Sequence, residues 1–146
     1  MGNRFVIIAA LILTFSLHGF AQSPQTQPVE EFAQAVAQAF AAGELGKLDA
    51  ERPYVRTVRL RIEHSISGQI VTRNFRTLAR LEQWLKGRER DEGPARNSGT
   101  LRRCRRGVCT FEQEGMLHNN LYLQRITYGL RRGRPYVKAI YLVDGD

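Results

Sequence analysis

The sequence is poor in cysteine, in histidine and in long apolar runs. Cys104 and Cys109 are its only cysteines, and 3 histidines are scattered along the 146 residues. A structural zinc site needs more ligands than two cysteines provide, so we predict neither a metal site nor a cofactor. The N-terminal apolar run, from Phe5 to Leu17, is shorter than the about 20 residues that a membrane-spanning helix takes. The chain also has no internal repeat and no low-complexity block, which argues against a repeat architecture.

The first 21 residues have the pattern of a signal peptide. Arg4 supplies a positive charge, the apolar run follows it, and Gly19-Phe20-Ala21 places small residues before Gln22. We therefore predict a signal peptide over 1–21, a polar, proline-containing linker over 22–28 and a single domain over 29–146. The mature protein would be secreted or periplasmic and would have no membrane span, with an uncleaved membrane anchor as the alternative.

The charge of the chain is strongly positive, and arginine supplies most of it. Lys+Arg number 22 against 14 Asp+Glu, and removal of Arg4 with the signal peptide leaves the domain at +7. Arginine suits bidentate binding of carboxylate, sulfate or phosphate groups, because its planar guanidinium presents a fixed fork of donors. The alternative is a solvated surface that only keeps the protein soluble. For an exported protein nucleic acid is not the default partner, so an anionic envelope polymer, an acidic protein surface or a small carboxylate ligand is expected.

Residues 100–111 are predicted to form a β-hairpin that holds both cysteines. Arg106-Gly107 is a two-residue turn signal between two β-prone runs, and a turn there places Cys104 directly opposite Cys109. Opposed antiparallel residues have Cα atoms about 4.5 to 5.5 Å apart, within reach of a disulfide. We therefore predict a Cys104–Cys109 bond, which closes a short loop and contributes about 2 kcal/mol to stability.

Two stretches before this hairpin have helical signals, and a strand pattern lies between them. The first helix has Pro28 at its first position and ends at Gly43, and a further helical turn covers 45–48. Thr77 caps a short second helix that stops at Gly87. Between them, apolar and polar residues alternate over 57–66, which predicts a long strand that turns at 67–69 into a second strand over 70–76. The apolar face of the long strand consists of Val58, Leu60, Ile62, His64 and Ile66.

The remaining residues predict an exposed loop and a meander. Residues 88–99 are charged and contain Gly-Pro, so we expect an exposed, mobile loop there. The cysteine hairpin, a loop over 112–120 and two β-rich runs over 121–130 and 136–143 follow. The sum is an α+β fold, with the N-terminal helix and a second short helix packed on one face of a curved, mostly antiparallel sheet of about six strands.

The order of these elements resembles the NTF2-like, or cystatin-like, cone. The segment 40–48, Phe-Ala-Ala-Gly-Glu-Leu-Gly-Lys-Leu, is similar to the Ala-Gly-Asp-Leu-type helix end of NTF2-like domains. A predicted hairpin before the second helix departs from that pattern, and the Asp or Tyr constellation of the isomerase members is not recognisable at matching positions. The resemblance implies a concave sheet that could enclose a pocket, and it implies no particular chemistry.

Topology predicts that two arginine-rich turns are neighbours. Alternate turns of a meander fall at the same end of the sheet, so the turn at 105–107 and the turn at 131–133 should share an edge. Clustered guanidinium groups repel one another unless an anion is present, which favours an anionic partner, whereas fanning out into water or pairing with nearby acids is the alternative. We call this predicted set the Arg rim: Arg102, Arg103, Arg105, Arg106, Arg131, Arg132 and Arg134.

Two further groups of residues are weaker candidates. His64 is the only titratable residue on an apolar strand face. It could act as an acid or base in a pocket, or it could be a hydrogen-bonded histidine at the edge of the core. We favour the second interpretation. An oxygen-rich group at the opposite end of the sheet matches no known cation-binding loop, and a solvated edge is favoured over calcium. This group consists of Glu112, Glu114, His118, Asn119, Asn120, Asp144 and Asp146.

Two functions remain open on these residues. We favour a non-enzymatic exported domain that binds an anionic ligand or partner through the Arg rim. The alternative is an NTF2-like pocket enzyme of isomerase or hydrolase type that uses His64. A deep cavity beside His64 would favour the enzyme, and a filled core would favour binding. A homodimer is compatible with the sequence.

Overall fold

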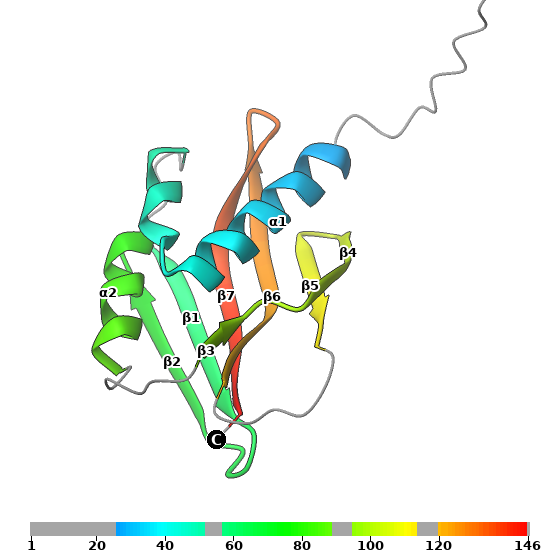
Figure 1. Ribbon diagram of the computed structural model, residues 1–146. Coiled ribbons are helices and arrows are strands. Elements are labelled where there is room, and N and C mark those ends of the chain that lie inside the picture. Colours follow the sequence, from blue (N-terminus) through cyan, green and yellow to red (C-terminus); the bar gives the residue numbers. More distant parts are fainter. Residues whose placement is uncertain (1–25, 52–56, 89–94, 114–119, 146) are drawn as a thin grey trace, which may run out of the picture.

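The computed structural model describes residues 26–51, 57–88, 95–113 and 120–145. They form two layers, in which the helices cover one face of a curved, mostly antiparallel sheet of seven strands (Figure 1). The predicted signal peptide and most of the linker lie outside the described residues. Within the described part, no helix combines the length and apolar character that crossing a bilayer requires. The α+β class predicted from the sequence is thus confirmed, with seven strands in place of about six.

Helix α1 (Thr26–Ala42) presents one apolar stripe to the sheet. Val29, Val36 and Phe40 are buried along it at the helical spacing that the sequence shows, and Ala33 and Ala37 allow a close approach to the strands. The helix ends in a Schellman motif, in which the Glu44 N–H donates to the Ala39 carbonyl and Gly43 has a φ of 71°. A left-handed residue is required there, so the predicted stop at Gly43 is confirmed.

A short 3₁₀ helix, η1 (Leu45–Glu51), connects α1 to the rest of the helical layer and holds the start of α2 (Leu78–Arg88). The Asp49 carboxylate accepts hydrogen bonds from the Leu78 and Ala79 N–H groups at 2.7 and 2.8 Å, and the Thr77 hydroxyl accepts one from the Arg80 N–H at 3.1 Å. These two acceptors satisfy donors that a helix start leaves unpaired. Thr77 therefore caps α2 as predicted, but α2 runs through Gly87 to Arg88.

The sheet has the order β2-β1-β7-β6-β5-β4, and β3 pairs with β6 beside this path. The strands are β1 (Val58–His64), β2 (Ile70–Phe75), β3 (Ala95–Asn97), β4 (Thr100–Arg105), β5 (Val108–Glu112), β6 (Asn120–Arg131) and β7 (Arg134–Gly145). β4 to β7 form the predicted antiparallel meander, and β1–β2 is the predicted hairpin. The two parts join where β1 lies parallel to β7, a pairing that local sequence patterns do not specify.

The cysteine hairpin has the predicted register. Cys104 lies opposite Cys109 with Cα atoms 4.0 Å apart, and a disulfide joins them. Arg106 and Gly107 both have positive φ values, 50° and 80°, as the central residues of a type I′ turn require. The β6–β7 turn repeats this geometry at Arg132 and Gly133, with φ values of 49° and 75°.

The prediction of an exposed loop over 88–99 is wrong for part of that range. Ala95–Asn97 forms β3, and the Arg96 side chain is only 6% exposed. Its Nη1 lies 2.6 Å from Oε1 of Glu82, itself 6% exposed, and donates to the Phe40 carbonyl at 3.3 Å. A buried guanidinium needs a charged partner, and Glu82 of α2 supplies it. Arg96 thus joins β3 to both helices.

The predicted length of β1 also needs a correction. The strand ends at His64, and Ile66 is 78% exposed in the turn that leads to β2. Alternation continues in the sequence past His64, but the backbone turns away from the sheet, with the His64 N–H bonded to the Gln69 carbonyl. The space between the helices and the sheet is filled by buried side chains, the largest of which include Phe40, Leu45, Leu60, Ile62, Leu81, Leu123, Ile126 and Leu142.

Candidate anion-binding site

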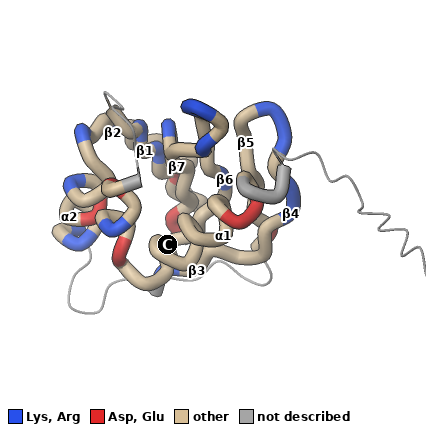
Figure 2. The backbone as a smooth tube through the Cα atoms, turned by 90° about the horizontal axis from the view of Figure 1, so that it is seen from above, with Lys and Arg blue, Asp and Glu red and all other residues tan. Residues whose placement is uncertain are grey.

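The two arginine-rich turns lie at the same end of the sheet. The Tyr128 N–H of β6 donates to the Gly107 carbonyl in the β4–β5 turn at 2.9 Å. Figure 2 shows the two turns as neighbouring blue segments seen from above. The seven side chains of the Arg rim are all exposed.

The turns are staggered along the strand direction. Arg132 follows Tyr128 by four residues, so the β6–β7 turn extends about 13 Å beyond the β4–β5 turn at the usual strand rise. Figure 1 shows this hairpin projecting past the rest of the sheet. The cations of the Arg rim therefore lie at two levels along the strand direction, with Arg106 at the lower level and Arg132 at the higher one.

A second set of cations covers the sheet face that the helices leave open. Arg59 and Arg61 are exposed on β1 between the buried Val58, Leu60 and Ile62, so they point away from the core. The register carries this face across the sheet: Arg61 pairs with Tyr141, Tyr141 with Arg125, Arg125 with Thr110, and Thr110 with Arg103. We call the set on this side the basic face: Arg59, Arg61, Arg103, Arg105, Arg125 and Lys138.

Tyr141 occupies the middle of the basic face. The guanidinium carbons of Arg125 and Arg61 lie 4.5 and 5.3 Å from its ring centroid, and its hydroxyl donates to the Glu63 carboxylate. Burial raises the pKa of Tyr141, and the hydrogen bond to the negatively charged Glu63 raises it further. The ring thus holds two arginines in place by cation–π contact, and Glu63 is engaged by the tyrosine.

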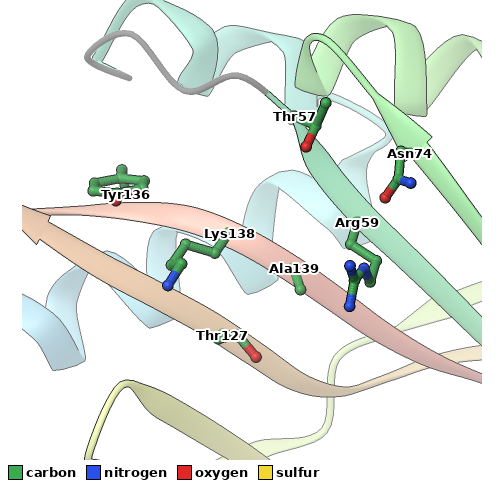
Figure 3. Close-up of a pocket in the computed structure, with 7 residues that line it drawn as sticks. All are labelled: Thr57, Arg59, Asn74, Thr127, Tyr136, Lys138 and Ala139. Atoms are coloured by element: carbon green, nitrogen blue, oxygen red, sulfur yellow. The ribbon is translucent and has the colours of Figure 1, made fainter.

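A pocket of about 460 Å³ opens on the basic face between β1, β6 and β7. Ala139 forms its floor, because its methyl group is small between the larger Tyr136 and Tyr141 of the same strand. Figure 3 shows Arg59 and Lys138 on either side of Ala139. Thr57, Asn74, Thr127 and Tyr136 complete the lining.

A smaller hollow of about 270 Å³ links the basic face to the Arg rim. Arg103, Arg105 and Arg106 line it together with Val108 and Thr110. Arg103 and Arg105 belong to both sets of cations, so rim and face form one continuous basic surface. Arg102, at the bulge between Leu101 and Arg103, lies outside this hollow.

His64 lies at the opposite end of the sheet from the Arg rim. Its Nδ1 is 3.4 Å from Oδ2 of Asp144, its register partner on β7, and the two side chains are 15% and 19% exposed. The packed core beside it consists of the residues that precede it on the inward face of β1, Leu60 and Ile62. His64 does not line either of the two pockets on the basic face.

The oxygen-rich group predicted at that end is only partly described. Asn120 pairs with Gly145, next to Asp144, so the two ends meet as the topology requires. Glu114, His118, Asn119 and Asp146 lie outside the described residues. Among the residues that are described, no three acidic, cysteine or histidine side chains come together as a metal site would need.

Comparison of the chain with protein families, with curated proteins and with solved structures finds no match in any of the three. The chemistry of the surface is therefore the basis for assigning a function. Sequence reasoning identified the Arg rim but missed the basic face and its pocket. The sequence signal that could have revealed the basic face is the solvent-exposed side of each strand, where arginines recur at alternate positions: Arg59 with Arg61, and Arg103 with Arg105.

Proposed function

We propose that this protein is a non-enzymatic binding domain that holds a polyanion on the basic surface formed by the Arg rim and the basic face. The observation that carries the proposal is the imbalance of charge on the open side of the sheet. Six cations project there against two acidic side chains: Glu63, which accepts a hydrogen bond from Tyr141, and Glu112 at the end of β5. Among the described residues, Arg59, Arg103, Arg105 and Lys138 have no acidic partner within ion-pair distance.

Such a surface is electrostatically unfavourable without a counter-charge. Guanidinium groups on neighbouring strands raise one another's electrostatic energy, and an anionic polymer would lower it for several groups at once. The strands fix the backbone spacing of the cations, so binding has to order only their side chains. We propose a secreted or periplasmic location, with which the disulfide is compatible, and therefore an envelope polymer as partner in preference to an acidic protein or a free carboxylate.

The alternative, a pocket enzyme using His64, has less support. His64 and Asp144 form a polar pair at the sheet end, but the inward face beside them is packed with apolar side chains. A catalytic histidine needs a space in which a substrate can reach it, and His64 lines neither pocket of the basic face. The NTF2-like relation likewise remains a proposal that rests on element order.

Retention on a sulfated polyanion matrix at increasing salt tests the proposal. The wild-type domain should bind at low salt and elute as screening shortens to about 8 Å at physiological ionic strength. Two triple variants, each removing three charges, separate a defined surface from general basicity. The rim variant is Arg105→Gln, Arg106→Gln and Arg132→Gln, and the control on the helical side is Lys47→Gln, Arg80→Gln and Lys86→Gln.

We expect the rim variant to elute at clearly lower salt than the control variant. Both variants carry the same net charge, so a difference between them reports the position of the charges. Equal elution of the two variants would leave only non-specific attraction, and the proposal of a binding surface would fail.

A further inference from the structure

We propose that the pocket over Ala139 binds one uronate residue of an acidic polysaccharide. This inference rests on the proposed polyanion binding and adds the class of polymer and the place where one of its units sits. The pocket lies within the basic face, so a chain of charged sugars that follows the surface passes over it.

Either of the two cations that line the pocket can pair with a carboxylate. Arg59 on β1 and Lys138 on β7 lie on opposite sides of Ala139, and their charged ends do not point toward each other (Figure 3). The guanidinium of Arg59 offers a fork of donors that matches both oxygens of a carboxylate, and the Lys138 ammonium adds a point charge. A neutral sugar would leave both cations without a partner.

The neutral side chains of the pocket favour a ligand that also carries hydroxyl groups. Thr57 and Thr127 each offer a hydroxyl, and Asn74 offers an amide. These groups donate and accept, as sugar hydroxyls do, whereas a sulfate only accepts hydrogen bonds. The mixture of two cations with three donor–acceptor groups therefore fits a carboxylated sugar better than an inorganic anion.

The aromatic residues of the face argue for a sugar and against a nucleic acid. The Tyr136 ring packs against Gly129 of β6, where a Cβ would lie 2.5 Å from the Cζ and hydroxyl oxygen of the ring. It gives the pocket one aromatic wall. The Tyr141 ring has Arg125 and Arg61 over it, so it is already in contact with cations. Single-stranded nucleic acids are held by successive bases on several open rings, which this face does not offer among its described residues.

The remaining surface suits a polymer longer than one sugar. From Arg59 on β1 to Arg105 on β4 the face crosses β7, β6 and β5, a distance of about 19 Å at the usual strand spacing. The hollow lined by Arg103, Arg105 and Arg106 lies at that far side. A uronate oligomer seated over Ala139 would place further carboxylates over these arginines.

Isothermal titration of the full domain with oligogalacturonate tests the inference, with polyglutamate of equal charge as the reference polyanion. Ala139→Leu fills the pocket without changing the charge. It should weaken oligogalacturonate binding at least about tenfold while leaving polyglutamate binding within about twofold, because only the sugar uses the hollow. Thr72→Leu, on the same face outside the pocket, is the matched control and should change neither affinity.

Tyr136→Leu provides a second variant in case Ala139→Leu lowers the thermal stability. It removes the aromatic wall and should also reduce oligogalacturonate binding selectively. If Ala139→Leu and Tyr136→Leu bind oligogalacturonate as the wild type does, the pocket inference is overturned while polyanion binding stands. Pocket-dependent binding of an oligonucleotide or polyglutamate in preference to oligogalacturonate would overturn it as well. Failure of the wild type to bind any of these polyanions at low salt would instead refute the proposed function.

Discussion

Removing the cation of the buried Glu82–Arg96 pair should destabilise the protein far more than removing an exposed arginine. Both side chains are 6% exposed, and Arg96 also lies over the Phe40 ring at 5.5 Å. Arg96→Met keeps a side chain of similar length but leaves the Glu82 carboxylate buried without its counter-charge. Loss of one partner of a buried pair costs about 3 to 5 kcal/mol.

That loss corresponds to a fall in melting temperature of about 12 to 20 °C, at about 4 °C per kcal/mol for a domain of this size. The double variant Glu82→Leu with Arg96→Met removes both charges and should recover most of the stability, because apolar replacements of a buried pair are often neutral. The Phe40 carbonyl keeps its hydrogen bond from the Gly43 N–H at 3.2 Å in either variant.

Urea unfolding followed by circular dichroism measures these free energies, and the double-mutant cycle isolates the coupling of the pair. Arg88→Met is the matched control, since Arg88 is exposed and lies over the Trp84 ring at 5.0 Å. We expect it to cost below about 1 kcal/mol. A cost for Arg96→Met no larger than for Arg88→Met, or additive effects of the two single changes, would refute the reasoning.

Two further predictions concern the hairpin and the basic face. Reducing the Cys104–Cys109 bond should lower the free energy of unfolding by about 2 kcal/mol in urea while the fold is kept, since the type I′ turn still sets the register; a chain that no longer folds would contradict this. Because the pKa of Tyr141 is raised in the folded state, the protonated phenol contributes stability that is present below pH 10 and lost as pH rises through the folded-state pKa. Ultraviolet titration of the wild type should therefore show one tyrosine that ionises at higher pH than the others, and this step should be missing in Tyr141→Phe. The same titration curve for both proteins would contradict the contact with Glu63.

Elements with a strong local signal could be predicted from the sequence. The helical spacing of Val29, Val36 and Phe40 and the left-handed Gly43 define α1 and its end. The Arg106-Gly107 turn aligns the cysteines without information from the rest of the chain. In these cases the deciding contacts lie within a few residues of each other, so periodicity and turn chemistry are sufficient.

Elements that depend on distant partners could not be predicted in the same way. β3 has three residues and no period of its own, and it exists because Ala95–Asn97 pairs with Asn120–Tyr122 of β6. Arg96 lies in a charged stretch that reads as exposed, and only the position of Glu82 on α2 makes its burial favourable. Ile66 continues an alternating pattern, but the bond between His64 and Gln69 turns the chain away.

The same distinction separates the two parts of the candidate site. The Arg rim could be identified because its arginines are adjacent in the sequence and its turns share an end in a meander. The basic face could not be identified in this way, because Arg61 and Arg125 meet at Tyr141 only when β1 lies beside β7. That pairing is parallel and joins two strands that are far apart in the sequence. The cations of the face are held by paired strands and by an aromatic ring, whereas Arg106 and Arg132 of the rim extend from two turns. A ligand therefore finds the face already arranged and has to order the rim, so the face should contribute the greater part of specificity and the rim mainly long-range attraction.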